Sequence, residues 1–167
     1  AITKGGFFYH FNGKGELARA LVERYLEEDA RMFNGLLEQA DRLSEDPLQR
    51  LLIFLNLLAE GVIGQTDVHP GCLAAAFTYE IQQFDDTMRV RIAAGMQDWR
   101  NMVAERLQLV LAKRQPRLPV EVDALADMFS ALLEGGIILA RIFNSNRVLY
   151  NQVLAYRSHL RLLFDEV

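Results

Sequence analysis

Apolar residues recur at intervals of three and four positions along most of this sequence, which is the spacing of an amphipathic α-helix. Helix-breaking residues are few, with four prolines and eleven glycines among 167 residues, and they stand mainly between the periodic stretches. No segment shows the alternation of apolar and polar residues that marks a half-buried strand. The sequence therefore predicts an all-α fold.

Local signals predict where the helices begin. Thr3 is the expected N-cap of a short first helix, and Asp46 followed by Pro47 marks the start of another. The helix after Pro47 is apolar on almost every side, although it carries Asn56, and this predicts a central position. The expected helices span about residues 3–9, 14–43 (as one helix or two), 47–63, 72–83, 85–114, 120–143 and 147–164.

The composition excludes several classes of protein. A single cysteine, Cys72, rules out an intramolecular disulfide framework and a metal site made of several thiolates. No apolar run approaches the roughly 20 residues that cross a bilayer, and no secretory signal is visible. We therefore expect a cytoplasmic protein without membrane contact.

The charge is unevenly distributed along the chain. The net charge is -4, yet residues 1–25 hold four basic and two acidic side chains, whereas residues 26–167 hold 14 basic and 20 acidic ones. A basic end on an acidic body is compatible with a surface that faces phosphate, although so small a bias also arises by chance. The adjacent acids Glu27, Glu28 and Asp29 point in different directions around a helix, which indicates a solvated face.

The first 17 residues combine features that suit contact with DNA. Thr3 opens a short helix, where free N–H groups and a hydroxyl can meet a phosphate. Gly5 and Gly6 let the backbone approach a broad surface, and Lys14 can reach a second phosphate. The helix is about 10 Å long, enough to lay its first turn in a major groove. The predicted DNA-binding residues are Thr3, Lys4, Gly5, Gly6, Phe8, Tyr9, His10 and Lys14. The alternative is an aromatic-rich helical hairpin packed on a core.

This segment resembles the recognition helix and the following helix of the TetR/AcrR family of helix-turn-helix repressors. Phe8 departs from the family pattern, which usually has at this position a Tyr whose hydroxyl contacts a phosphate; the neighbouring Tyr9 is a partial substitute. The resemblance covers about the second half of the motif, so it implies that two further helices of a DNA-binding domain precede Ala1. The residues that match in order and spacing are Thr3, Lys4, Gly5, Phe7, Phe8, His10, Phe11 and Lys14.

The resemblance also implies a domain organisation and a function. Residues 1–25 would be the C-terminal part of a helix-turn-helix domain, and residues 26–167 a helical effector-binding and dimerisation domain. The protein would be a ligand-responsive transcriptional regulator, as a rule a repressor, that leaves its double-stranded DNA operator when a small apolar or amphipathic effector binds. No enzymatic activity, metal or cofactor is expected.

The last two expected helices are the predicted homodimer interface. Their apolar stripes, over 120–143 and 147–164, look too continuous for an exposed surface, and a four-helix contact between two copies would bury them. Gly135 and Gly136 lie in mid-helix, where each costs roughly 1 kcal/mol relative to alanine. Close helix approach at a subunit interface explains them, and so does a ligand cavity beside the backbone.

Three helices can enclose the effector in a mostly apolar cavity with one acidic group. The acid is Glu80, which needs a partner or a purpose if it is buried; Arg89, Arg91 and Arg100 are candidate partners. The predicted ligand-binding residues are Phe54, Leu58, Cys72, Phe77, Glu80, Met96, Trp99 and Met102. Plain core packing is the alternative role for each.

Two other functions compete with a regulator. One is an all-α enzyme with a site near His69, Cys72 and Glu80, although the sequence supplies no third group to orient a Cys–His pair. The other is a helical adaptor without a DNA partner.

Overall fold

The computed structural model describes residues 3–79 and 86–164, and all regular structure in these ranges is helical, which confirms the all-α prediction. The helices are α1 (Lys4–His10), α2 (Lys14–Leu43), α3 (Pro47–Ile63), α4 (Leu73–Tyr79), α5 (Asp86–Leu111), α6 (Val122–Ile142) and α7 (Asn146–Phe164). The last residues of the expected helix 72–83 fall outside the described ranges. No helix within them has both the length and the apolarity that a bilayer span requires.

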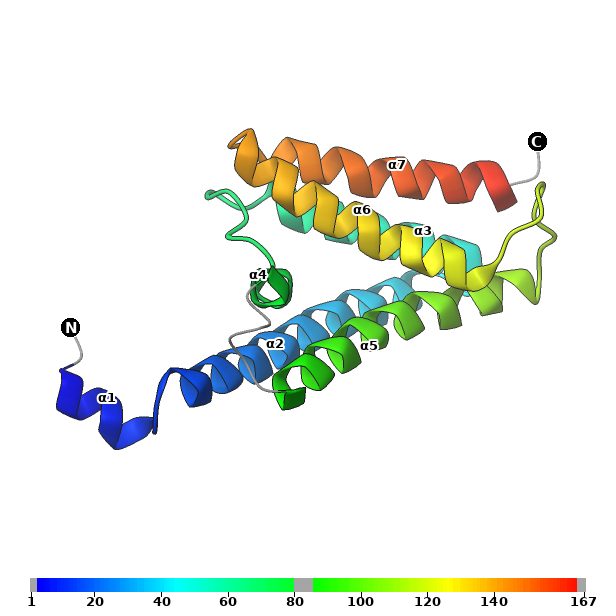
Figure 1. Cartoon of the computed structure of the whole chain (residues 1–167). Helices are drawn as coiled ribbons and strands as arrows, with labels where there is room; N and C mark the ends of the chain where they lie inside the picture. The colour runs from blue at the N-terminus through cyan, green and yellow to red at the C-terminus, as the bar shows by residue number, and fades with distance from the viewer. Residues whose placement is uncertain (1–2, 80–85, 165–167) are drawn as a thin grey trace.

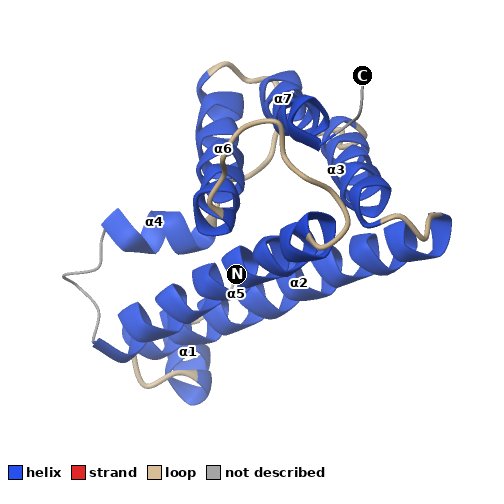
Figure 2. Ribbon diagram, turned by 90° about the vertical axis from the view of Figure 1, so that its right-hand side faces the viewer, coloured by secondary structure: helices blue, strands red, loops and turns tan. Residues whose placement is uncertain are grey.

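The helices form two packed groups (Figure 1). The long helices α2 and α5 run side by side, and α3, α6 and α7 lie together above them, as the second view also shows (Figure 2). α3 contacts α2, α5 and α7, so its predicted central position is confirmed, although Asn56 itself is exposed. The short helix α1 extends away from the body beyond the first residue of α2 (Figure 1).

The predicted helix starts are confirmed by their capping contacts. The Thr3 hydroxyl accepts a 3.1 Å hydrogen bond from the main-chain N–H of Gly6, and the Asp46 carboxylate accepts one of 3.0 Å from the N–H of Gln49. Pro47 is the first residue of α3. α2 is a single helix of 30 residues, so it runs unbroken through residue 25, where the sequence suggested a domain boundary.

The apolar stripes of α6 and α7 pack inside the protomer. Phe129 and Tyr156 are buried with ring centroids 5.7 Å apart, and the Tyr156 hydroxyl donates a 2.9 Å hydrogen bond to the main-chain carbonyl of Leu125. The reason given above for a dimer interface is therefore wrong, because these stripes need no second chain to cover them. A different apolar set on the same helices stays exposed: Ile138, Leu139, Ile142, Phe143 and Leu162.

Candidate functional site

A cavity of about 110 Å³ lies in the body of the protein, between the α2–α5 pair and the group of α3, α6 and α7. An apolar cavity of about 150 Å³ accommodates benzene, so this space suits a molecule of about five or six non-hydrogen atoms. The lining residues are Tyr25, Asp29, Met32 and Phe33 of α2; Leu58, Gly61 and Val62 of α3; Gln65 and His69 of the next loop; Trp99 of α5; Leu133 and Ile137 of α6; and Leu149 of α7.

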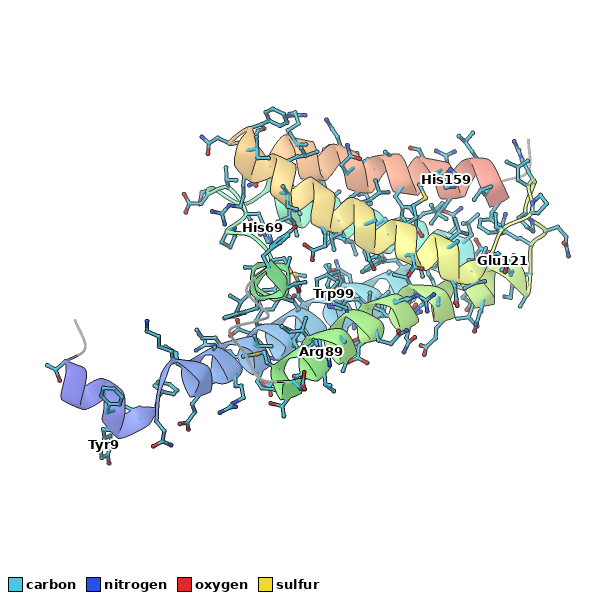
Figure 3. The ribbon with its side chains drawn as sticks, viewed as in Figure 1. Tyr9, His69, Arg89, Trp99, Glu121 and His159 are labelled. Atoms are coloured by element: carbon cyan, nitrogen blue, oxygen red, sulfur yellow. The ribbon has the colours of Figure 1, made fainter. Side chains whose placement is uncertain are left out.

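Aromatic side chains form one wall of this cavity. The rings of Phe33 and Trp99 meet edge to face with centroids 5.2 Å apart, and both residues are buried. Phe54 is fully buried behind Phe33, at 6.2 Å between ring centroids. Figure 3 shows Trp99 among the side chains that fill the space between the two groups of helices. This wall is fixed by core packing, so it holds its shape without a ligand.

A polar cluster adjoins the aromatic wall. It consists of Tyr25 and Asp29 on α2, Cys72 immediately before α4, and Glu134 on α6. The Tyr25 hydroxyl interacts with both the Cys72 thiol and the Asp29 carboxyl, and the Cys72 thiol faces the Glu134 carboxyl. One oxygen of Asp29 and both oxygens of Glu134 are buried without an N–H or O–H donor among the described residues, and Glu134 has the weak S–H donor of Cys72 beside it. Buried carboxylate oxygens are normally hydrogen-bonded, so these three stand out as poorly satisfied.

The surroundings shift the pKa values of this cluster. Burial raises the pKa of Asp29 from 3.8 to about 6; the charges of Glu134 and Glu28 add to the rise, and hydrogen bonding with Tyr25 opposes it. Burial also raises the pKa of Glu134 and, together with the facing Glu134 carboxyl, raises the pKa of the Cys72 thiol to about 11. The Tyr25 pKa is raised by burial as well. The cluster therefore disfavours negative charge on every member.

The loop between α3 and α4 closes one side of the cavity and positions His69 (Figure 3). Asn146 holds this loop: its side chain accepts a 3.0 Å hydrogen bond from the His69 N–H and donates one of 2.8 Å to the Asp67 carbonyl. The Nδ1 atom of His69 accepts a 3.1 Å hydrogen bond from the Gly71 N–H, and the Arg141 guanidinium donates to the Pro70 carbonyl. Burial and the Arg141 charge lower the pKa of His69, so the imidazole is neutral at physiological pH.

The eight residues predicted to bind the effector do not gather at one place. Leu58 and Trp99 line the cavity, Phe54 lies directly behind its wall, and Cys72 belongs to the polar cluster. Their assignment to ligand binding remains a prediction.

The other four predicted residues lie elsewhere. Met96 lines a separate open groove together with Glu134, and Met102 packs half-buried against the core. Phe77 lines a groove near α1. Glu80 lies outside the described residues, so its role is not addressed by the structure.

The arginines considered as partners for Glu80 have other carboxylates beside them. Arg89 pairs with Asp86 at 3.2 Å within α5. Arg91 reaches Glu23 of α2 at 2.8 Å. Arg100 reaches Asp127 of α6 at 2.6 Å and Asp123 at 3.1 Å. The contacts of Arg91 and Arg100 join α5 to α2 and to α6.

Sequence reasoning missed Tyr25, Asp29 and Glu134. The expectation that Asp29 belongs to a solvated face is wrong, because Asp29 is half-buried and borders the cavity. A signal was present: Asp29 is three residues after Leu26 and four before Phe33, both of which are buried, so helical periodicity places it on the inward stripe of α2. No comparable signal marks Glu134, which lies at the edge of the buried face of α6.

The predicted DNA-binding residues gather at the protruding end of the molecule. Lys14 is the first residue of α2 and is exposed, and Tyr9 is 85% exposed on α1 (Figure 3). The rings of Tyr9 and His10 meet edge to face at 5.0 Å. A Cβ atom added at Gly5 would meet nothing within 4 Å. This end therefore presents aromatic, hydrogen-bonding and cationic groups to the outside, with small residues that allow close approach.

An open groove of about 630 Å³ lies between α1, the first turns of α2 and α4. Phe8, Leu17, Leu21 and Phe77 contribute its apolar lining. Phe8 and Phe77 thus border one surface although they are far apart in sequence.

Two comparisons of sequence give consistent results. Residues 47–155, more than half of the chain, match the family model described as tetracyclin repressor-like, C-terminal domain. The transcriptional regulator AcuR of Cereibacter sphaeroides is 29% identical over 141 residues, which cover 84% of this chain and 63% of AcuR. The HTH-type transcriptional repressor DhaR of a Mycobacterium species is 26% identical over 145 residues, covering 84% of this chain and 67% of DhaR. The chain thus spans less than two thirds of the length of AcuR.

Solved structures agree with the sequence matches. The regulatory protein TetR from Rhodobacter sphaeroides superposes with a TM-score of 0.75 at 27% identity, covering 98% of this chain and 82% of that one. A TetR transcriptional regulator from Chloroflexus aurantiacus reaches a TM-score of 0.78 at 22% identity, covering 98% and 80%, which is similarity of fold alone.

Proposed function

The chain belongs to the TetR family of transcriptional regulators, and on that premise we propose that it binds an operator through α1 and the start of α2 and releases it when a small molecule fills the cavity. Repression followed by release is the direction of regulation that we propose, and the description of DhaR as a repressor supports it. Because operator DNA in a bacterium is cytoplasmic, we propose that location as well.

The observation that carries this proposal is the course of α2. This helix begins with Lys14 at the end proposed to contact DNA, and its middle turns supply Tyr25, Asp29 and Phe33 to the cavity. A ligand that changes the packing of these three side chains acts on the same rigid element that carries Lys14. Regulation then requires only that the ligand bind more tightly to the conformation with low DNA affinity.

The residues proposed to contact DNA fall into two roles. Thr3 and Lys14 are proposed phosphate contacts, which set affinity without reading sequence. Tyr9 and His10 are proposed to face the groove, where Gly5 and Gly6 permit close approach, and Phe8 supports them. Lys4 is proposed to contact DNA as well, and its side chain lies outside the part of the chain that the structure describes. In this proposal residues 1–25 form the DNA-contacting part and residues 26–167 the effector and dimerisation part.

We also propose that the protein acts as a homodimer through α6 and α7. The exposed apolar residues Ile138, Leu139, Ile142 and Phe143 occupy adjacent positions on the last turns of α6 and just after it. Contiguous apolar side chains of this kind are typical of an interface between copies of one chain. Two copies would present two α1 helices to successive turns of DNA.

An enzyme that uses His69 and Cys72 finds less support. The Cys72 thiol is buried with a raised pKa, whereas a nucleophilic cysteine has a lowered one. Its sulfur accepts a 3.3 Å hydrogen bond from the N–H of Ala75, which is a capping role at the start of α4.

The test is operator selection with the full-length protein. Genomic fragments that it retains at physiological salt are sequenced, and one fragment is titrated by fluorescence anisotropy with and without small organic molecules. We expect a preferred duplex bound at least a thousandfold more tightly than random DNA. Equal affinity for all duplexes would count against a sequence-specific regulator.

A further inference from the structure

We infer that the cavity binds a small organic cation, a protonated amine with an apolar body, whose ammonium group is held by Asp29 while Glu134 supplies further negative charge. The regulatory meaning of this inference rests on the proposed function, but the binding itself does not involve DNA.

The buried carboxylate oxygens are the first reason. One oxygen of Asp29, which lines the cavity, is buried without a hydrogen-bond donor among the described residues. The buried carboxyl of Glu134, beside the cavity, has next to it the Cys72 thiol, which is a weak donor. None of the described residues that line the cavity is a lysine or an arginine, and the imidazole of His69 has a lowered pKa. Burying an ionised carboxylate without a partner is costly, so a ligand that brings a positive charge or N–H donors to this place is stabilised.

The form of the cavity limits the size of the cation. About 110 Å³ suits about five or six non-hydrogen atoms. Leu58, Val62, Leu133 and Ile137 supply aliphatic wall, which matches a short hydrocarbon body.

The aromatic residues favour the same charge. Trp99, Phe33 and Tyr25 line the cavity together with Asp29. The face of an aromatic ring attracts a cation, and the attraction is stronger when the ammonium group is desolvated. An anion of the same size would meet the Asp29 carboxylate and an aromatic wall, without a lysine or an arginine among the described lining residues. The cavity therefore distinguishes between ligands of equal shape by the sign of their charge.

The raised pKa values are consistent with a site that a cation completes. Asp29 interacts with Tyr25 and Glu28 on its own helix and with Glu134 on α6, and of these only Tyr25 lowers its pKa. His69 lines the same cavity. A bound ammonium group would restore the ionised form of Asp29, because an opposite charge within a few ångströms stabilises it.

The experiment compares three molecules of nearly equal size that differ in charge: n-butylamine, 1-butanol and butyrate. Trp99 is the only tryptophan of the 167 residues and lines the cavity, so its fluorescence reports binding at this place. Calorimetry at pH 7.5 gives the dissociation constants independently. We expect butylammonium to bind at least tenfold more tightly than 1-butanol, and butyrate not to bind at about 50 mM, a concentration that detects small weak ligands.

Two variants and a matched control locate the charge. Asp29→Asn should weaken butylammonium binding at least tenfold and leave 1-butanol unchanged within twofold, and Glu134→Gln should weaken butylammonium by a smaller factor. The control is Glu27→Gln, which removes a carboxylate two residues before Asp29 on α2; Glu27 is exposed. It should change no affinity more than twofold. Circular dichroism establishes that each variant is folded.

The wild-type series alone can overturn the inference. Equal affinity for the amine and the alcohol, tighter binding of butyrate, or no butylammonium binding at about 50 mM would each do so. Retained amine binding in a folded Asp29→Asn variant would remove Asp29 from the site. Amine binding without any effect on the operator would instead count against the proposed function and leave the inference standing.

Discussion

Gly136 of α6 lies directly against Leu149 of α7: a Cβ atom at residue 136 would stand 2.7 Å from Cδ1 and 3.3 Å from Cα of Leu149. Leu149 is buried, and the contact with its Cα is a main-chain contact that no side-chain rotation can relieve. At the preceding residue, Gly135, an added Cβ would meet nothing within 4 Å. The close approach that the two glycines suggested is therefore made by Gly136 alone, and it joins two helices of one protomer.

Substituting each glycine in turn tests this difference. Gly136→Ala should lower the free energy of unfolding by about 1 to 2 kcal/mol, because overpacking outweighs the gain in helix propensity. Gly135→Ala should raise it by about 0.5 to 1 kcal/mol, because only the propensity changes. Urea denaturation of both variants measures the two values; destabilisation of equal size in both would refute the assignment.

Asp29→Asn should change how stability depends on pH. The Asp29 pKa is higher in the folded protein, about 6, than its ordinary 3.8, so the folded state binds this proton more tightly. The stability that the proton provides is complete below pH 3.8 and is lost as the pH rises through about 6. A rise of this size is worth about 3 kcal/mol for a fully buried group, and solvent screening at half-buried Asp29 reduces it to the order of 1 kcal/mol.

Urea titrations between about pH 4 and pH 7 should therefore show wild type losing stability relative to Asp29→Asn. Taking the difference between the two proteins removes the contributions of titratable groups that do not interact with Asp29, whereas Glu134 and Tyr25 interact with it and contribute to the difference. A pH-independent difference would mean that Asp29 titrates normally.

Lys14→Ala should weaken the binding of all duplexes by a similar factor. A phosphate contact carries no sequence information, and its loss should reduce the slope of log affinity against log salt by about one. Lys113→Ala is the matched control, because Lys113 is an exposed lysine just after the C-terminal end of α5, outside the proposed DNA-contacting segment. Anisotropy titrations at several salt concentrations make the comparison. A change in sequence preference without a change in slope would contradict the phosphate role.

Ile142→Glu should convert the proposed dimer into a monomer. Ile142 is 67% exposed at the end of α6, where a second copy would bury it, and a charge in an apolar interface is costly. Val90→Glu on α5 changes an equally apolar residue that is 63% exposed and should leave the dimer intact. Light scattering at micromolar concentration distinguishes the dimer from a chain of 19.0 kDa. A monomeric wild type would argue against the dimer itself.

Features set by neighbouring residues could be predicted from the sequence. The caps at Thr3 and Asp46, the central position of α3 and the inward faces of α6 and α7 depend on local preferences and on helical periodicity. Whether the stripes of α6 and α7 pack against each other or against a second chain depends on contacts far apart in sequence. Helical periodicity predicts which face of a helix is buried, but not which helix covers that face.

The candidate site was accessible to sequence reasoning only in part. Helical spacing identifies Leu58 and Trp99 as buried apolar residues. Glu134 belongs to the polar cluster only because the fold brings it beside Cys72 and Asp29, which come from two other segments. A side chain whose pKa is set by such distant neighbours leaves no pattern in its own helix. Phe77 was predicted to line the cavity, but its side chain lines the groove beside Phe8 instead.

Because α2 is continuous, a small rotation of the helix beside the cavity displaces its first residue by a larger distance. With a rise of 1.5 Å per residue, Lys14 stands about 22 Å from Asp29 along the axis. If the helix pivots by about 5° at the level of Asp29, Lys14 moves by about 2 Å, and α1 beyond it moves further. Displacements of that size separate a hydrogen bond from a broken one. A ligand of about five non-hydrogen atoms that shifts the cavity wall by only a fraction of an ångström can therefore change the positions of Lys14 and α1.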